Sequence, residues 1–250
     1  MSEAIINNAF YDDLDERWYN DDGHIIGLLK AESRLKTIYV KEIFSREKVA
    51  TRCKILDIGC GAGLISNELA KDGFEIHGID QSASSVEVAK RHAARNSNVT
   101  YVAGDAFALP YEDKSFDVVM LLDFLEHVTD PGAAIKEATR VLNPGGIILF
   151  YTFNRTWIAG LLAVKAVEFI AKDCPKNFHL LSMFIKPVEL KQMLRNAGSD
   201  FVEFRGLRPV IFHKPFFASI FQRKVAKGFD FKFTNNLSLG YMGYGIKSAH

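Results

Sequence analysis

Glycines and acids recur in the first half of this chain where a small polar molecule could bind. Gly59, Gly61 and Gly63 form a G-x-G-x-G run directly after the apolar segment 54–58. Glycine tolerates positive φ and has no Cβ, so such a turn lets the backbone approach a ligand closely. Asp80 and Asp105 follow the next two apolar segments along the chain. The glycine run alone is also compatible with a tight turn or a dinucleotide site.

The spacing of these residues favours one ligand over the others. A dinucleotide site has G-x-G-x-x-G, whereas this run is one residue shorter. The carboxyl ends of parallel strands meet at one edge of a sheet, where ligands bind. Asp80 at that edge can accept hydrogen bonds from both ribose hydroxyls, and Asp105 can meet the exocyclic amine of adenine. We interpret the set as a site for S-adenosylmethionine.

The elements that must position these residues alternate regularly. Short apolar segments read as strands, and the stretches between them have helical patterns, with Asp130 and Pro131 as a predicted helix start. This alternation predicts an α/β fold with a mostly parallel, Rossmann-like sheet and helices on both faces. The five predicted strands are 54–58, 74–79, 99–102, 116–122 and 147–152; the helices are 64–71, 82–94, 131–142 and 187–197; two further strand candidates are 201–207 and 239–246.

Composition excludes several classes of protein. Of 250 residues, 48% are apolar and 24% charged, which is ordinary for a soluble globular chain, and the net charge of +1 argues against a nucleic-acid binder. Three cysteines, Cys53, Cys60 and Cys174, suggest neither a disulfide framework nor a zinc site. We expect reduced thiols and a cytoplasmic location, because residues 1–20 do not have the pattern of a secretory signal and no apolar run reaches ~18–20 residues.

Residues 54–152 resemble the class I S-adenosylmethionine-dependent methyltransferases. The resemblance rests on ILDIGCGAG, GID at 78–80, GDA at 104–106, the FDVV strand and LNPGG. It implies that the glycine turn contacts the methionine part of the cofactor, that Asp80 binds ribose and that Asp105 binds adenine. The product would be S-adenosylhomocysteine. The cofactor-binding set so expected is Asp57, Gly59, Cys60, Gly61, Asp80, Gln81, Asp105, Ala106 and Leu122.

The flanking segments resemble the O-methyltransferases of ubiquinone biosynthesis, which methylate polyprenylated catechols and demethylubiquinols. The likeness rests on FYDDLDERW at 10–18, DFLEHV at 123–128, FNR at 153–155, FIKPVEL at 184–190 and GYM at 240–242. It implies seven strands with an antiparallel last strand and a lid inserted after strand five. The family usually has a histidine near position 29 or 30, where Leu29 and Lys30 stand here.

The same resemblance implies two further sets of residues. A basic residue near the N-terminus, Arg34 or Lys36, would pair with the carboxylate of the cofactor. Asp123, Glu126 and His127 form D-x-x-E-H, which is similar to an E-x-x-E-H motif proposed to hold a divalent cation. Two carboxylates and an imidazole would suit Mg²⁺ or a softer ion. The alternative is that Glu126 and His127 shape the substrate pocket without metal.

We divide the chain into four regions: an N-terminal helical cap at 1–48, a cofactor-binding core at 49–152, a lid or lipid-contact insertion at 153–187, and a C-terminal part at 188–250 that completes the sheet. The predicted lid helix, Trp157–Lys172, carries Lys165, Glu168 and Lys172 on one side and apolar residues over the rest. Such a helix either packs on the core or lies in a membrane interface.

Residues 205–232 contain seven Lys or Arg against one acid, with phenylalanines interleaved. Three interpretations stay open: an anionic lipid surface, a single-stranded nucleic-acid site, or a solvated loop over a phenylalanine core. We favour a membrane surface or a channel for a prenyl chain, and expect no nucleic-acid partner. The protein would then be peripheral on the inner face of the membrane.

Methyl transfer to a phenolic oxygen requires a base or a metal to remove the proton. The candidate bases are His127 and His179. The leading hypothesis is therefore an O-methyltransferase that acts on a polyprenylated quinone precursor, a lipophilic phenol. One alternative is a methyltransferase for another acceptor, by C-methylation of a quinone or O-methylation of a natural product. Another is a non-catalytic scaffold that binds the cofactor or a lipid.

Overall fold

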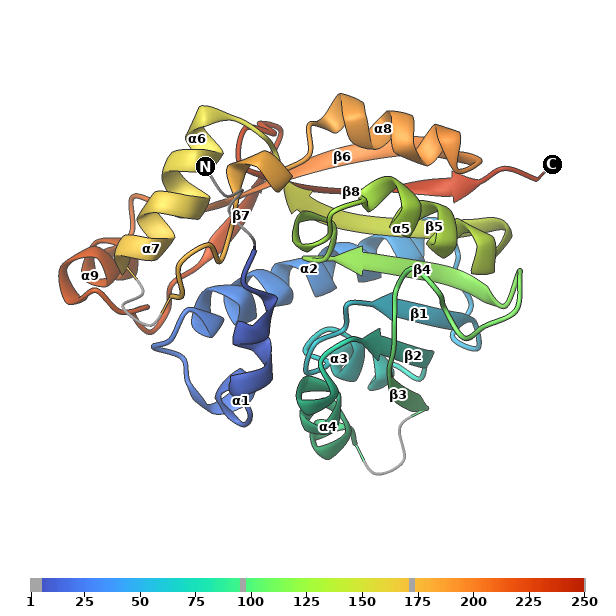
Figure 1. Ribbon diagram of the computed structural model, residues 1–250, viewed down its shortest axis with the longest axis horizontal. Helices are drawn as coiled ribbons and strands as arrows, with labels where there is room; N and C mark the ends of the chain where they lie inside the picture. Colours follow the sequence, from blue (N-terminus) through green and yellow to red (C-terminus); the bar gives the residue numbers. More distant parts are fainter. Residues whose placement is uncertain (1–5, 95–97, 171–173, 250) are drawn as a thin grey trace.

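One eight-stranded sheet organises the molecule, in the order β3-β2-β1-β4-β5-β8-β6-β7 (Figure 1). The computed structural model describes residues 6–94, 98–170 and 174–249. Adjacent pairs among the first five strands are parallel, and β8 is antiparallel to β5. β6 and β7 then continue the sheet, each antiparallel to its neighbour. The strands are β1 (Lys54–Ile58), β2 (Glu75–Asp80), β3 (Val99–Ala103), β4 (Phe116–Leu122), β5 (Leu142–Phe153), β6 (Ser199–Pro209), β7 (Phe231–Thr234) and β8 (Gly240–Lys247).

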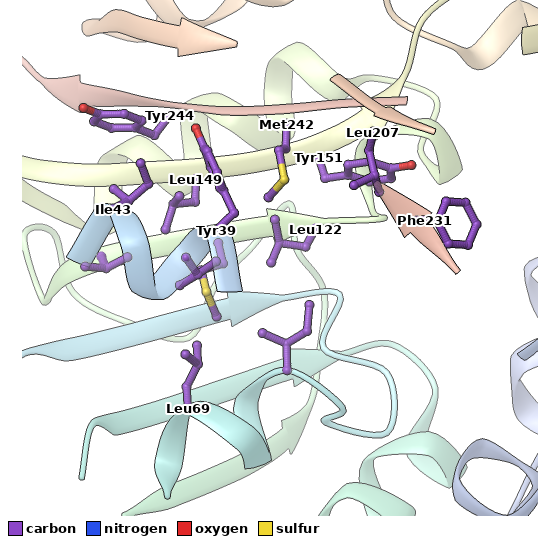
Figure 2. Close-up of a cluster of buried hydrophobic side chains, with 14 of the residues drawn as sticks. Tyr39, Ile43, Leu69, Leu122, Leu149, Tyr151, Leu207, Phe231, Met242 and Tyr244 are labelled. Atoms are coloured by element: carbon purple, nitrogen blue, oxygen red, sulfur yellow. The ribbon is translucent and has the colours of Figure 1, made fainter. Parts of the chain in front are cut away.

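Helices cover both faces of the sheet, because the central strands bury alternate side chains on opposite sides. In β4, Met120 packs with α2 (Ile26–Arg46) and α3 (Ser66–Ala70), and Figure 2 shows this cluster around Tyr39, Leu149 and Tyr151. Val119 and Leu121 of the same strand pack instead with α5 (Pro131–Val141) and α8 (Pro187–Asn196). Near β3, α4 (Ala83–His92) packs on Tyr101. The predicted α/β sheet with two helical layers is confirmed.

Helix ends follow the expected capping chemistry. The Asp130 carboxylate accepts a hydrogen bond from the Ala133 amide at 2.9 Å, and Pro131 opens α5. The Ser82 hydroxyl accepts a hydrogen bond from the Ser85 amide at 3.2 Å and starts α4. The Ser82 contact fixes the start of α4 directly after β2, which ends at Asp80, one of the expected ligand-binding acids.

The prediction of seven strands is wrong, since the sheet has eight. The additional strand is β7, which pairs with β6 through Gly206–Pro209 at the edge of the sheet. The predicted turn at 143–146 also differs, because it lies within β5 as an irregularity where Gly145 has φ +78°. Phenylalanine-rich sequence after residue 210 contains α9 (Lys214–Gln222), for which the sequence predicted no helix.

Two helical segments lie at the edge of the sheet where β1 to β5 end. The N-terminal one contains η1 (Asn8–Asp13) and α1 (Arg17–Asn20), and leads into α2. The other, which we call the lid, runs continuously through α6 (Trp157–Ala159), η3 (Gly160–Ala166) and α7 (Val167–Ile170). Its middle part is a π-helix, a rare form that often occurs at functional sites. Lys172 of the predicted lid helix lies outside the described residues.

Two short 3₁₀ turns complete the structure, η2 (Leu125–His127) after β4 and η4 (Leu181–Met183) after the lid. Within the described part of the chain, we find no helix with the length and apolarity needed to cross a bilayer.

Candidate active site

The glycine turn after β1 lies under two aromatic side chains. The amides of Gly59 and Cys60 donate hydrogen bonds to the Ile79 carbonyl at 2.8 and 3.2 Å, which ties the turn to β2. Gly59 has φ +75°, and a Cβ there would lie 2.7 Å from the Phe124 ring. Gly61 has φ +50°, and a Cβ there would lie 3.0 Å from the Trp18 ring. Side chains are thus excluded from both positions by conformation and by space.

Acids stand at the ends of the first three strands, each fixed by hydrogen bonds. Asp57 is buried and accepts a hydrogen bond from the Ser66 hydroxyl at 2.6 Å; burial raises the pKa of its carboxyl to about 7. The Asp80 carboxylate accepts from the amides of Gly61 and Ser82 at 2.8 and 2.9 Å. Asp105 accepts from its own turn, so these carboxylates are held in place before any ligand arrives.

These residues line one cavity of about 250 Å³. The order of strands reverses between β1 and β4, and ligands in open α/β sheets bind at such a point. Nine of the eleven residues that the sequence proposed for cofactor binding meet here: Asp57, Gly59, Cys60, Gly61, Asp80, Gln81, Asp105, Ala106 and Leu122. The sequence reasoning therefore found the wall of this cavity that the sheet supplies.

The other two, Arg34 and Lys36, do not line it. Arg34 is exposed on the outer side of α2. Lys36 is fully buried on the inner side, where its ammonium contacts Glu32 and Asp123 instead of the cavity. Residues two apart on a helix point in different directions, so at most one of them could have faced the sheet.

A second cavity, of about 400 Å³, adjoins the first. Its lining is mainly apolar and comes from the lid, α9, the end of β5 and β7, with Phe153, Leu162, Phe169, Phe216 and Phe231 among the contributors. Four residues line both cavities: Tyr11, Leu29, Asp123 and His127. An acid-lined cavity therefore meets a more apolar one, and His127 of the segment 125–127 lies at their junction.

The two candidate histidines lie near this junction, with ring centroids 5.4 Å apart. His179 Nδ1 is 3.0 Å from the Ala163 carbonyl oxygen, so it must donate the hydrogen, and Nε2 keeps the lone pair. His127 Nδ1 lies 3.2 Å from Asn8 Oδ1, which assigns the same tautomer to His127. Burial lowers the pKa of His127 to about 3 and that of His179 to about 4, so both are neutral at pH 7.

The three proposed metal ligands do not form a metal site in this arrangement. Among the described residues, no three His, Cys, Asp or Glu side chains are grouped so that they could hold an ion. Both Asp123 oxygens contact the Lys36 ammonium, at 2.5 and 2.6 Å. Glu126 is buried with neither oxygen hydrogen-bonded, and burial raises the pKa of its carboxyl to about 8. A neutral carboxyl and an occupied carboxylate are poor ligands for a hard cation.

Sequence reasoning missed the wall that the N-terminal segment supplies. Asn8, Tyr11, Asp12, Trp18 and Ser33 line the first cavity. The segment is held in place because the Ser85 hydroxyl donates to the Tyr11 carbonyl and the Ser84 hydroxyl to the Asp12 carbonyl, at 3.1 and 2.9 Å. The available signal was the aromatic content of 10–18, which is unusual in so acidic a stretch.

Comparison with known proteins agrees with this geometry. Residues 56–150 match the model of a methyltransferase domain. The ubiquinone biosynthesis O-methyltransferase of Saccharophagus degradans is 37% identical over 80% of this chain and 83% of its own. That of Coxiella burnetii is 33% identical over 83% and 88%.

The fold is also similar to a solved structure. The magnesium protoporphyrin IX methyltransferase of Synechocystis, determined with bound S-adenosylhomocysteine, matches with a TM-score of 0.62 at 17% identity. That match covers 87% of this chain and 84% of that one.

Proposed function

Because this chain belongs to the family of ubiquinone biosynthesis O-methyltransferases, we propose that it methylates a phenolic oxygen of a polyprenylated quinone precursor. S-adenosylmethionine supplies the methyl group when it is bound. The observation that carries the proposal is the junction of an acid-lined cavity with a larger, more apolar one at Asp123 and His127. A lipophilic phenol could place its ring at the junction and its chain in the apolar cavity.

The residues of the first cavity fit the cofactor. Gly59 and Gly61 line the cavity without side chains, so their backbone would contact the methionine part, and Asp80 and Asp105 offer carboxylate oxygens to ribose and adenine. Trp18, one of the N-terminal residues that line this cavity, would cover the ligand from that side. Closing the cavity from both sides holds the reacting atoms in line, which supplies several kcal/mol of the barrier.

His127 is the base in this proposal, because it alone of the two histidines lines both cavities. Asn8 holds its Nδ1–H, so Nε2 is left to accept the phenolic proton. A pKa near 3 makes the proton transfer unfavourable from the resting phenol. The phenolic O–H becomes strongly acidic only as the new O–C bond forms. The proton therefore moves to His127 late, when the oxygen already carries positive charge.

The apolar cavity gives the substrate class. Its lining residues Leu162, Val167 and Phe169 belong to the lid, and Phe216 and Ile220 belong to α9. Burying a methylene is worth ~0.8 kcal/mol, so each five-carbon prenyl unit seated there adds substantially to affinity. We therefore expect the enzyme to prefer prenylated over unprenylated catechols.

The outer surface around this cavity suits a membrane. Phe217 and Phe221 are exposed on α9, Phe212 is exposed just before it, and Trp157 is exposed at the start of the lid. Arg223 joins the two elements, since its Nε donates to the Phe169 carbonyl at 3.1 Å (Figure 1 shows α7 and α9 side by side). Aromatic side chains next to cations favour an anionic lipid surface. We propose that this end of the molecule rests on the membrane that holds the substrate.

A liposome experiment tests that surface. The double variant Phe212→Ser/Phe221→Ser should co-sediment with phosphatidylglycerol vesicles at least about tenfold more weakly, because each buried phenylalanine is worth ~1.5–3 kcal/mol. Val188→Ser is the matched control, since Val188 is also exposed but lies on α8. Equal binding by the wild type and the double variant would remove the membrane proposal.

Methyl transfer itself is tested with a labelled cofactor and catechols that carry zero, one, two and three prenyl units. We expect labelled product at the oxygen, with kcat/KM rising along the series. Calorimetry with S-adenosylhomocysteine checks cofactor binding separately. Binding of the cofactor product without transfer to any phenol would contradict the proposed reaction.

A further inference from the structure

Lys36 sits in a closed cage of acidic and aromatic groups. Its Nζ lies 2.5 and 2.6 Å from the two Asp123 oxygens and 2.8 Å from Glu32 Oε2. It also lies 3.6 Å from the centroid of the Tyr151 ring, a cation–π contact. The side chain is fully buried. Glu32 comes from the preceding turn of α2, whereas Asp123 comes from the end of β4, so the cage joins the helix to the sheet.

Burying the Lys36 ammonium costs free energy. Moving an ammonium out of water costs several kcal/mol even after relaxation, and only well-placed counter-charges recover it. Lys36 lines neither cavity, so it would not touch a ligand bound in either of them. What it does contact is Asp123, which lines both cavities and has φ +58°. Residues other than glycine seldom adopt that region, although aspartate does so more readily than most, and the ammonium helps to hold Asp123 there.

The position of this ammonium matters because Asp123 opens the D-x-x-E-H motif. A divalent ion bound there would need lone pairs of the Asp123 carboxylate, and both of its oxygens are turned to Lys36. The remaining two members are not arranged around a common point with Asp123 in the described structure. A single positive charge, the Lys36 ammonium, already occupies both oxygens of the first residue of the motif.

We propose that the Lys36 ammonium is a built-in substitute for the divalent cation, and that it positions Asp123 at the junction of the cavities so that methyl transfer needs no added metal. Lys36 is a positioning residue in this scheme, because it acts through Asp123. The inference rests on the proposed methyl transfer for its kinetic readout, but its metal-binding readout is independent of that activity.

The first test uses the full-length wild-type enzyme with S-adenosylhomocysteine bound. After dialysis against a chelator, Mn²⁺ is titrated and the free ion is followed by electron paramagnetic resonance. We expect no stoichiometric Mn²⁺ binding, and methylation of a prenylated catechol that changes less than about twofold with EDTA or added Mg²⁺. One bound Mn²⁺ per chain that disappears in Asp123→Asn would overturn the proposal.

The second test removes the ammonium. Lys36→Ala vacates the cage and leaves Glu32 and Asp123 facing an empty volume, so it should gain Mn²⁺ binding and become dependent on Mg²⁺ for whatever activity it keeps. Lys36→Met, which fills the space without charge, should lower kcat at least about tenfold while the dissociation constant of S-adenosylhomocysteine changes less than threefold. Lys41→Met on the exposed side of α2 is the matched control and should change neither.

These outcomes separate the possible roles of Lys36. A hundredfold loss of S-adenosylhomocysteine binding in Lys36→Met would show a cofactor ligand and overturn the inference. If the Lys36 variants fail to fold, as circular dichroism would show, the wild-type Mn²⁺ titration still decides. If the wild type methylates no phenol, the proposed function fails, while the same titration still tests whether the ammonium excludes the metal.

Discussion

His127 and His179 share one chemical feature, an Nδ1–H committed to a neighbour and an Nε2 left free to accept a proton. Asparagine reproduces the Nδ1 donor of histidine and lacks Nε2, so His127→Asn keeps the hydrogen bond to Asn8 and removes the proposed base. We expect kcat to fall about 10²–10⁴-fold, the usual contribution of a general base, with cofactor binding unchanged. His179→Asn keeps the hydrogen bond to the Ala163 carbonyl and should lower kcat much less. Steady-state kinetics checks both, and a larger loss at His179 would reverse the assignment.

Asp57 gives a prediction about stability. Burial raises the pKa of its carboxyl from 3.8 to about 7, so the folded protein holds a proton that the unfolded chain releases between those values. The free energy of unfolding should therefore fall as pH rises through that window. The asparagine in Asp57→Asn still accepts the hydrogen bond from the Ser66 hydroxyl, but it does not titrate, so it contributes no pH dependence to stability. Between pH 4 and 7.5, the free energy of unfolding of the variant should rise by roughly 4 kcal/mol relative to that of the wild type, as measured by urea denaturation. A difference that is constant with pH would contradict it.

At the scale of elements, sequence reasoning worked where a strand is buried on both faces. Segments 54–58 and 116–122 are mainly apolar, and β1 and β4 have those bounds. It failed at β7, where Phe231 and Phe233 alternate with polar residues, because a run of only four residues gives a weak signal and pairing with β6 makes it a strand. The junction of the cavities could not be predicted either, because Tyr11 and His127 meet there although more than a hundred residues separate them in the sequence.

The lid controls how much chain the apolar cavity can hold. Ala166 lines that cavity from η3, so Ala166→Trp should fill part of it. We expect KM to rise at least about tenfold for a catechol with two or three prenyl units, because several methylenes lose their apolar contacts. The unprenylated catechol is the control and should keep its KM. A uniform rise along the series would mean that the substitution disturbs the site itself.

Across the whole molecule, the N-terminal segment ties the two cavities together. We propose that the described part of the region 1–48, from residue 6 on, acts as a cap over both, because Tyr11 and Leu29 line the two cavities and the cap rests on Ser84 and Ser85 of α4. Ordering the cap around the cofactor would also complete one wall for the acceptor. The two ligands are then coupled through a shared element and not through contact alone.

This coupling predicts that S-adenosylhomocysteine tightens binding of a prenylated catechol about fivefold or more, and that the catechol tightens S-adenosylhomocysteine by the same factor, as linkage requires. Calorimetry in both orders of addition measures the two factors. Tyr11→Ala removes a side chain that lines both cavities and should bring both factors towards one, while Tyr111→Ala, a tyrosine outside both cavity linings, should leave them unchanged. If the cofactor product has no effect on catechol affinity in the wild type, the cap does not link the cavities.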